Sequence, residues 1–598
     1  MKPKTNGVNK LTDIEEKVRQ SLKGASFIHG KIIPSASKRY LHLAENIVRQ
    51  AVSWQNEEGR IIDPYEKRET NTLTARFVGA LGLLILKGRC LDLIEPCTRA
   101  LTPALEDLFH KKFWWVEFIT KEACMAYMAL KDKVQTKQAA YWNHLLNDYD
   151  PELVYSYTFT NNPHHLKNNV CTFGIAGEAI KKKLGGADNC DFINRYIEQQ
   201  LTLFDKNGMY NDPHSPMTYD MVARMNLSLA LWAGYVDQYY EKLSEILKLG
   251  ALSQLLYQSP VGECPFGGRS NQQNFNEVTF ALICEFEASR WAEQGDPAMA
   301  GSYKRAAALA INSIEKYLQT TPIFFTKNLF PPETQHGRQA DYGFYGAYSL
   351  LIASQLGFAA ILADDNIKET KCPAECGGYV FITEKSFHKV FATCAEYHIE
   401  IDTNADFKYD ATGLGRVHRI GFPAELALSI PINAKPDYLT VIPPAGSNFS
   451  ISPGWNNVWL SNLSGEKLHS ACKVFEESRD RVCFSIDYTY DSYTISEKHD
   501  ISSNGIEILA TQHEGHPLSF RIPLLKTNGA DETIIKMLDD GFLVLLDNFA
   551  YRVSCLTANT KISIENIDAP NRNGIYKIGC FTGDKNQMHL LLKLEKTM

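Results

Sequence analysis

Several features that would point to a membrane, a nucleic acid or a secretory route are missing or scarce in this chain of 598 residues. No window reaches about 18 consecutive apolar residues, so the sequence predicts no membrane span. The first ten residues lack the apolar core of a signal peptide. We therefore expect a cytoplasmic protein, or an exported, periplasmic one whose signal has been removed from this numbering. The net charge of −7 offers no basic stripe, so no nucleic-acid partner is expected.

Signatures of metal, disulfide and phosphate sites are also scarce. The 14 cysteines are scattered from Cys90 to Cys580, and their only close pair is Cys372 and Cys376. A zinc site would need a second pair or histidines at matching spacing, and none follows. We expect reduced, mostly buried thiols. The chain contains neither a GK[ST] phosphate loop nor a GxSxG serine elbow, so the sequence predicts no metal and no other cofactor.

The sequence does contain a long helical part. Hydrophobic residues make up 44% and charged residues 22%, as in an ordinary globular core. From residue 1 to about 365, apolar residues recur at helical spacing, as in Ser37 to Trp54 and in the largely apolar stretch Thr72 to Leu86. Loops rich in Asn, Asp, Gly and Pro separate roughly a dozen such segments. No fixed-period repeat is present, which argues against a common solenoid.

After about residue 372 the pattern changes to short segments rich in β-branched and aromatic residues, such as Val482 to Tyr488 and Met588 to Leu594. Turn signals such as Asn528-Gly529 separate them. We predict two domains, with residues 1–370 all-helical and residues 371–598 an antiparallel β-sandwich. A dozen helices paired as hairpins can close into an (α/α) toroid, either incomplete or of six hairpins. The fold class is therefore α+β and multidomain.

Two polar clusters lie early in the helical part, at predicted helix junctions, where loops carry sites on a rigid scaffold. The first runs from Thr158 to Asn169 and includes Asn162 and His165. It is either a capped loop, since Asn favours turns, or part of a central cleft. The second, at residues 211–224, includes His214 and Tyr219. Its alternative interpretation is a helix amino terminus with a proline near the start.

A third cluster, Gly267 to Glu277, is the most unusual segment of the chain. It joins two glycines to Arg269, Asn271 and Asn274 just before an apolar helix. This density of amides and a guanidinium is poor core material but suits the recognition of hydroxyls and carboxylates. We therefore predict that Arg269, Asn271 and Asn274 bind substrate.

Two further clusters add candidate substrate-binding residues. The segment 335–348 contributes His336, Arg338 and Tyr342, although its tyrosine stripe is also typical of core packing. In the predicted sandwich, residues 409–419 contribute Arg416 and His418. This glycine-rich loop either reaches back over the helices or forms a solvated hairpin.

The mixture of Asn, His, Tyr and Arg fits one chemistry, the β-elimination of a uronic acid sugar. The proton on C5 is weakly acidic because it lies α to a carboxylate. Neutralising that carboxylate with Asn, His or Arg donors makes its removal feasible. A Tyr or His then takes the proton, and a Tyr can return one to the leaving oxygen. Tyr219, His214, His165 and Asn162 are the candidate catalytic residues.

In this arrangement the chain resembles the toroid polysaccharide lyases, such as alginate lyases and heparinase III-type lyases. The resemblance implies that an Asn and a His come from one toroid loop, here Asn161 or Asn162 with His164 or His165. It implies that Tyr219 is the catalytic tyrosine. A further polar residue would come from the sandwich, which Arg416 or His418 would supply. The implied partner is an acidic oligo- or polysaccharide.

Two other functions remain open from the sequence. A glycoside hydrolase that releases a uronic acid such as glucuronate would need two carboxylates. The clusters offer Glu277 and Asp220 as the catalytic pair, and also Asp212 and Asp341. A non-catalytic glycan-binding protein would keep the Arg and aromatic contacts without needing Tyr219.

Overall fold

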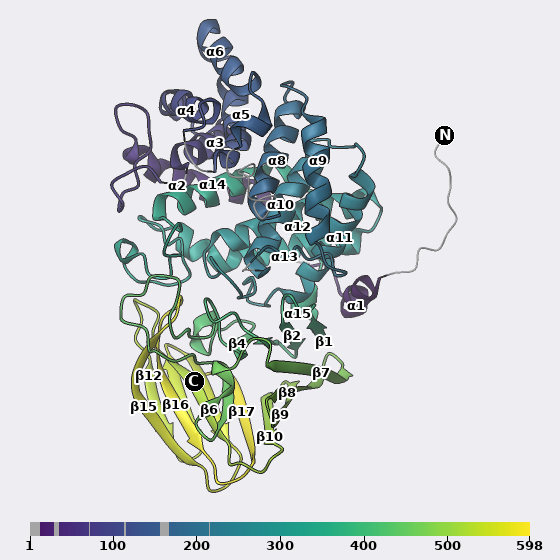
Figure 1. Ribbon diagram of the computed structural model, residues 1–598, viewed down its shortest axis with the longest axis vertical. Helices are drawn as coiled ribbons and strands as arrows, with labels where there is room; N and C mark the ends of the chain where they lie inside the picture. Colours follow the sequence, from purple (N-terminus) through teal and green to yellow (C-terminus); the bar gives the residue numbers. More distant parts are fainter. Residues whose placement is uncertain are drawn as a thin grey trace, which may run out of the picture.

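The computed structural model describes residues 12–28, 35–70, 72–112, 115–155, 167–213 and 216–597. Helices build the first part of the chain and antiparallel strands the second (Figure 1). The last long helix ends at Leu362 and the first strand begins at Tyr379, so secondary structure changes from helix to strand between these residues. The predicted combination of helical toroid and β-sandwich is confirmed.

The helices form two concentric layers. The inner layer consists of α3 (Leu73–Leu86), α5 (Ile119–Leu130), α8 (Asn169–Lys183), α10 (Pro216–Trp232), α12 (Phe275–Glu293) and α14 (Tyr345–Leu362). Each packs against the next, and α14 packs against α3, so these six helices close a ring. Around them lie α2 (Ala36–Ala51), α4 (Ile94–Phe109), α6 (Thr136–Asn147), α9 (Cys190–Gln200), α11 (Tyr240–Tyr257) and α13 (Pro297–Leu318). The short helices α1 (Asp13–Leu22), α7 (Pro151–Val154) and α15 (Pro373–Cys376) complete the described helices.

The position of a helix in the toroid explains its composition. Outer helix α2 buries one stripe, including Tyr40, Leu43, Ile47 and Ala51, and exposes its opposite face. Inner helices α3 and α14 are buried on nearly all sides and are apolar nearly throughout. Inner helices α10 and α12 also bury charged residues, which are held in ion pairs. Helix α14 is long and apolar enough to cross a membrane, but 94% of its apolar window is buried inside the protein. Its apolar composition is explained by its position in the inner layer of the ring, where neighbouring helices cover it.

All strands pair antiparallel, in three sheets. The first is β1 (Tyr379–Ile382), β2 (Lys389–Cys394), β3 (Tyr397–Asp402) and β4 (Gly413–Arg419), in that order. The second is β12 (Ile534–Leu538), β13 (Gly541–Leu546), β14 (Phe549–Cys555), β17 (Gln587–Lys596), β10 (Gly505–Gln512), β9 (Tyr493–Ser502), β8 (Arg481–Tyr490) and β7 (Leu468–Glu477). The third is β15 (Lys561–Pro570), β16 (Ile575–Thr582), β11 (Ser519–Thr527), β5 (Ser452–Trp455) and β6 (Val458–Trp459).

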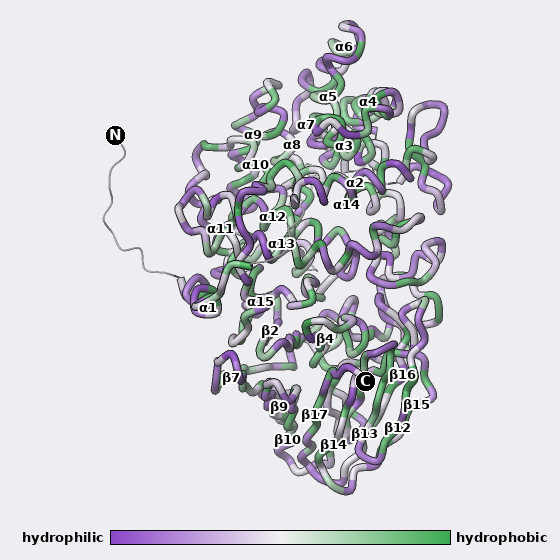
Figure 2. The backbone as a smooth tube through the Cα atoms, turned by 180° about the vertical axis from the view of Figure 1, so that it is seen from behind, coloured by the Kyte–Doolittle hydropathy of each residue, from purple (hydrophilic) through white to green (hydrophobic). Residues whose placement is uncertain are grey.

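The two larger sheets bury a common apolar core, to which β14 and β17 contribute hydrophobic residues that stand out in Figure 2. The four-stranded sheet lies between this core and the helices (Figure 1). Phe381 and Phe391 belong to the apolar core of the toroid, whereas Val380 and Val390 belong to that of the sandwich. Strands β2 and β3 are therefore buried along their whole length, unlike half-buried strands such as β8.

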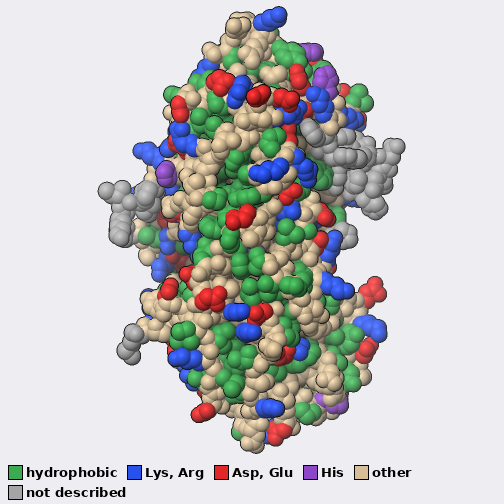
Figure 3. All heavy atoms as spheres, turned by 90° about the vertical axis from the view of Figure 1, so that its left-hand side faces the viewer, with side chains coloured by type: hydrophobic (Ala, Val, Ile, Leu, Met, Phe, Trp, Pro, Cys, Tyr) green, Lys and Arg blue, Asp and Glu red, His purple; other side chains and the backbone are tan. Residues whose placement is uncertain are grey.

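On the face of the molecule shown in Figure 3, basic and acidic side chains are interspersed over both the helical and the strand part. Neither sign of charge forms a continuous stripe there.

The sandwich core contains a carboxyl group that makes stability depend on pH. Glu497 is 1% exposed and lies between Ile486 of β8 and Ala510 of β10. Neither of its side-chain oxygens has a hydrogen-bond partner among the described residues. Burial raises the pKa of Glu497 to about 8, from an ordinary value of 4.5. The folded protein therefore keeps this proton over a pH range in which the unfolded chain has lost it.

We expect the free energy of unfolding to fall as pH rises from about 4.5 to about 8, because the unfolded state releases the proton of Glu497 first. Lowering the pH from 8 to 5 should raise the stability of the wild type by a few kcal/mol relative to Glu497→Gln. Thermal unfolding of both proteins at the two pH values measures the difference. Glu595→Gln, at an exposed position of strand β17 in the same sheet, is the control and should behave like the wild type. Identical pH profiles for the wild type and Glu497→Gln would contradict the assignment.

Candidate active site

A pocket of about 600 Å³ opens at one end of the helical ring. Its walls come from the first turns of inner helices and from the loops that precede them. The lining residues are Arg76, Trp115, Phe118, Lys167, Asn168, Asn169, Val170, Phe173, Leu203, Asp212, Pro213, Tyr219, Val222, Arg269, Phe275, Tyr342, Tyr348 and Leu351. The positive ends of helix dipoles thus face the pocket, and unpaired helix N–H groups favour anions.

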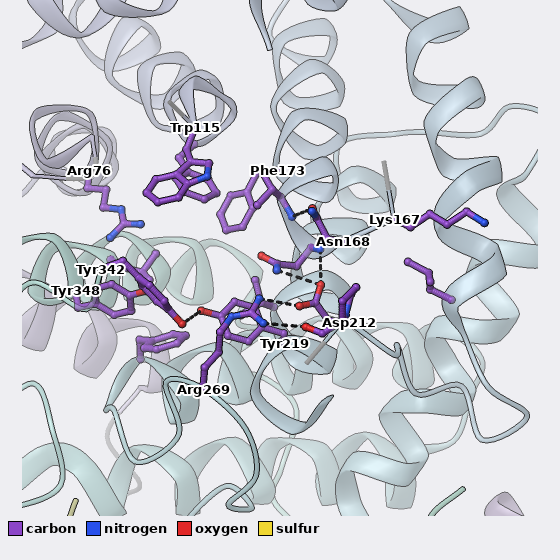
Figure 4. Close-up of a pocket in the computed structure, with 18 residues that line it drawn as sticks. Arg76, Trp115, Lys167, Asn168, Phe173, Asp212, Tyr219, Arg269, Tyr342 and Tyr348 are labelled. Carbon is purple, nitrogen blue, oxygen red and sulfur yellow. Dashed lines mark hydrogen bonds and ion pairs between the residues drawn. The ribbon is translucent and has the colours of Figure 1, made fainter. Parts of the chain in front are cut away.

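The hydroxyl groups of Tyr219 and Tyr342 meet on one side of this pocket (Figure 4), and the hydroxyl of Ser270 lies beside both. The Tyr219 hydroxyl lies 3.2 Å from that of Tyr342 and 3.3 Å from Ser270 Oγ. Ser270 Oγ lies 3.0 Å from the Tyr342 hydroxyl. Burial, reinforced by the neighbouring Tyr219, raises the pKa of Tyr342 well above its usual value. Each hydroxyl can donate or accept, so this cluster can pass a proton between a bound molecule and the protein.

Arg269 lies directly over the ring of Tyr219, with its guanidinium carbon 3.8 Å from the ring centre. Its Nη2 donates to Asp212 Oδ2 at 2.7 Å, and its Nη1 donates to the Pro213 carbonyl at 3.0 Å. Burial opposes the charged form, but Tyr219 and Asp212 outweigh it and raise the pKa of Arg269. The pocket therefore holds a fixed positive charge beside a tyrosine hydroxyl.

Asp212 joins the two sides of the pocket. While its Oδ2 holds Arg269, its Oδ1 accepts the backbone N–H of Asn169 at 2.7 Å and the Asn169 side-chain amide at 3.1 Å. The start of α8 and the loop that carries Arg269 are thereby tied to one carboxylate (Figure 4). Asp212 is the only Asp or Glu among the described residues that line the pocket.

A second guanidinium and an aromatic wall complete the pocket. Arg76 of α3 donates to the Ala347 carbonyl at 2.7 Å and lies 5.4 Å from the ring centre of Tyr348. Burial lowers the pKa of Arg76. Phe118 and Phe173 meet edge to face at 4.4 Å. Aromatic faces of this kind can pack on the apolar face of a sugar ring.

The structure brings three of the predicted site residues together in this pocket, namely Tyr219, Arg269 and Tyr342. Asn162, His165 and His214 lie outside the described residues. The remaining predicted residues lie elsewhere, and each has structural contacts that account for it.

Asn271 and Asn274 maintain the loop before α12. The Asn271 side chain donates to the Gly268 carbonyl at 2.6 Å, and the Asn274 side chain donates to the Phe324 carbonyl at 2.7 Å. Both residues are buried and neither lines the pocket. These amides satisfy backbone groups of a buried loop, which accounts for both residues without a role in substrate binding.

His336 and Arg338 also lie outside the pocket lining. His336 Nε2 donates to the Asn571 carbonyl at 2.7 Å, and its Nδ1 accepts the Val441 N–H at 3.1 Å. Burial lowers the pKa of His336 to about 4, so the ring is neutral. Arg338 lies over the ring of Phe344 at 4.8 Å. Both residues sit where the toroid meets the strand part and do not reach the pocket.

Arg416 and His418, the predicted contribution of the sandwich, do not line the pocket. Arg416 donates to the carbonyls of Cys264 at 2.8 Å and Ser429 at 3.0 Å. His418 lies between the hydroxyls of Ser259 and Ser429, at 2.8 Å from each. Both side chains are buried on strand β4 and fasten the four-stranded sheet to the helices. The glycine-rich segment is thus neither a solvated hairpin nor part of the pocket lining.

The two carboxylates predicted for hydrolysis are not in the pocket either. Glu277 binds Lys327 at 2.5 Å, and Asp220 binds Arg224 and accepts the Tyr257 hydroxyl at 3.3 Å. Both carboxylates are completely buried in these ion pairs. Burial raises the pKa of each, and the neighbouring cation opposes that shift.

Some pocket residues were missed from the sequence. Arg76 is the single charged residue in the apolar stretch 72–86, and a lone charge in such a stretch could have marked it as a candidate site residue. Asp212 was noted only as an available carboxylate, because its contacts come from segments 43 and 57 residues away. No group of three or more His, Cys, Asp or Glu side chains among the described residues could hold a metal ion.

Comparison with known proteins identifies the fold. No protein-family model and no curated protein sequence matches this chain. A structure of heparinase III matches with a TM-score of 0.50 and 9% identity over 96% of this chain and 86% of its own. A Streptomyces coelicolor chondroitin AC lyase, solved in complex with chondroitin sulphate, matches with a TM-score of 0.51 and 9% identity over 97% and 82%. An unsaturated glucuronyl hydrolase from Streptococcus agalactiae matches with a TM-score of 0.42 and 10% identity, over 61% of this chain and 99% of its own.

The chain thus shares the toroid-and-sandwich architecture of heparinase III and chondroitin AC lyase over nearly its whole length. The architectural resemblance inferred from the sequence is confirmed.

Proposed function

We propose that this chain is a lyase that cleaves a uronic-acid-containing oligo- or polysaccharide by β-elimination. The observation that carries the proposal is the pairing of Tyr219 with Arg269. The Arg269 guanidinium lies 3.8 Å from the centre of the Tyr219 ring, and both residues line the pocket. The one carboxylate among the described lining residues, Asp212, is bound to Arg269. An acid/base group and a charge-neutralising group are the two requirements of the reaction.

The reaction follows from this arrangement. Arg269 binds the carboxylate of the uronate and withdraws charge from it, which acidifies the proton on the adjacent C5. Tyr219 acts in this step as a phenolate beside the Arg269 cation. Its oxygen takes that proton, the electron pair forms a double bond between C4 and C5, and the bond from C4 to the leaving oxygen breaks. The Tyr219 hydroxyl formed in this way then gives the proton to the leaving oxygen, which restores the phenolate. The neighbouring hydroxyls of Ser270 and Tyr342 hold the Tyr219 oxygen in place.

The charge of the pocket supports an acidic substrate. Arg76, Lys167 and Arg269 line it against one carboxylate, and helix amino termini add positive potential. The chondroitin AC lyase of the same fold was solved with an acidic polysaccharide bound. Hydrolysis, in contrast, needs two carboxylates flanking the scissile bond. The described lining offers only Asp212, which is already bound to Arg269.

Product analysis tests the proposal. Purified protein is incubated with uronate-containing glycans of several linkages, and the products are examined by mass and ultraviolet absorbance. Elimination leaves an unsaturated sugar that absorbs in the ultraviolet and adds no water. Saturated products that have gained one water per cleavage would establish a hydrolase instead. The absence of any cleavage together with tight binding would establish a glycan-binding protein.

A further prediction concerns Glu277 and Asp220, which we assign to stability rather than chemistry. Glu277→Gln and Asp220→Asn each remove the anion from a buried ion pair and leave its cation buried, which should cost about 3–5 kcal/mol. The thermal midpoint should therefore fall, while turnover per folded molecule should stay within about twofold of the wild type. Melting curves and initial rates measured below the lower midpoint check this. A loss of turnover with an unchanged thermal midpoint would show that these carboxylates take part in catalysis.

A further inference from the structure

We infer that Arg572, in the turn between β15 and β16, is a positioning residue for the pocket. It acts through Gln339 on Ser270, whose hydroxyl contacts both Tyr219 and Tyr342. The strand part thus controls the geometry of a pocket whose lining comes from the helical part. Of the two tests below, only the measurement of activity rests on the proposed function, and hydrogen exchange does not.

The turn that carries Arg572 is firmly held against the toroid. Asn571 Oδ1 accepts the backbone N–H groups of Asn573 at 2.9 Å and Gly574 at 3.1 Å, which fixes the turn internally. The Asn573 side chain donates to the Lys327 carbonyl at 2.8 Å. All three residues from 571 to 573 are buried. The turn is therefore a rigid insert between the helical and strand parts.

Arg572 itself is fully buried, which is costly for a guanidinium without partners. Its Nη2 donates to Gln339 Oε1 at 2.9 Å, and its Nη1 donates to the Gly337 carbonyl. Its guanidinium carbon lies 4.1 Å from the ring centre of Tyr438. These contacts fix the plane of the guanidinium and therefore the position of the Gln339 oxygen.

Gln339 connects Arg572 to Ser270. Its Oε1 also accepts the backbone N–H of Ser270 at 3.1 Å, while its Nε2 donates to the Asp437 carbonyl at 2.5 Å. The amide cannot turn over without losing all three contacts, because its oxygen would then face the Asp437 carbonyl and its NH2 group would face the two donors. Gln339 is thus locked in the orientation that holds Ser270.

The loop that receives these contacts needs external support. Ser270 has φ 61° and Gln272 has φ 58°, a left-handed conformation that is unfavourable for residues other than glycine. The turn at residues 571–573 holds both of these residues. Arg572 holds Ser270 through Gln339. Asn573 holds Gln272 directly, because its Nδ2 donates to Gln272 Oε1 at 3.2 Å. Without these contacts, we expect the loop to relax and to move Ser270 and the adjacent Arg269 away from Tyr219.

Hydrogen exchange tests this positioning without any substrate. In Arg572→Met, the amide of Ser270 and its neighbours in residues 267–272 should exchange at least about tenfold faster than in the wild type. Arg479→Met is the matched control, because Arg479 also joins the strand part to backbone carbonyls of the helical part, those of Ser21 and Lys23. It should leave exchange in residues 267–272 unchanged. Unchanged exchange in Arg572→Met would overturn the inference, as would equal acceleration in both variants.

The activity arm uses a double-mutant cycle with Gln339→Leu. Displacing catalytic groups by about 1 Å can cost up to about 100-fold in rate. We expect kcat to fall at least about tenfold in each single variant, with KM changed by less than about threefold. Because the two residues act in series, the double variant should be no slower than the slower single one. If the kcat losses of the two single variants multiply in the double variant, Arg572 does not act through Gln339 and the inference is overturned. If the wild type cleaves no uronate glycan, the proposed function fails, and the exchange result still decides the positioning role.

Discussion

Replacing Tyr219 by Phe is expected to lower the turnover of an acidic glycan by about 100-fold or more. The change removes only the side-chain oxygen that would take the proton from C5, and it keeps the ring under Arg269. The lost hydrogen bonds, at 3.2 and 3.3 Å, are worth about 1 kcal/mol, so the thermal midpoint should move by no more than about 2–4 °C. Initial rates and melting curves of the same preparations measure both effects.

Tyr257→Phe is the matched control for this experiment. Tyr257 is also a buried tyrosine of the helical part, and its hydroxyl bonds to Asp220 away from the pocket. Its loss should lower stability by a similar amount and leave turnover unchanged. If Tyr219→Phe is fully active, the elimination mechanism with Tyr219 as acid/base is excluded. If both variants lose turnover to the same degree, the effect is one of packing.

The second large effect is expected at Arg269. Removing its guanidinium in Arg269→Ala deletes a charge-assisted contact worth about 1.5–3 kcal/mol, so kcat/KM for a uronate glycan should fall about ten- to 150-fold. Asp212 would also lose its cation, although the two bonds from Asn169 remain. Binding of a neutral glycan of the same length should change much less. Calorimetric titration with acidic and neutral oligosaccharides measures this difference.

Arg290→Ala is a close control for Arg269→Ala. Arg290 also lies over an aromatic ring, that of Phe286, and is ion-paired, to Glu287. Its side chain is 16% exposed, against 20% for Arg269, but it lies in the last turn of α12. This change should affect stability and spare the discrimination between acidic and neutral glycans. Equal losses on both ligands in Arg269→Ala would make Arg269 structural.

The sequence by itself determined the architecture. Residues at helical spacing and then at strand spacing come from local preference and from burial on one face, and both can be recognised within a window of a few turns. The unusual polarity of Gly267 to Glu277, just before an apolar helix, also singled out Arg269, which lines the pocket. Tyr219 and Tyr342 likewise come from loop-to-helix junctions at the pocket end of the ring.

The tertiary structure alone decided which polar residues face the pocket. Arg269, Asn271 and Asn274 belong to one cluster, yet the two asparagines satisfy buried backbone groups. The same holds for His418, whose ring lies between two serines that are 159 and 11 residues away along the chain. A buried polar side chain must find a partner, and a distant segment can supply it. The sequence shows that such residues are present, whereas only the packing of toroid against strands shows which of them are already paired.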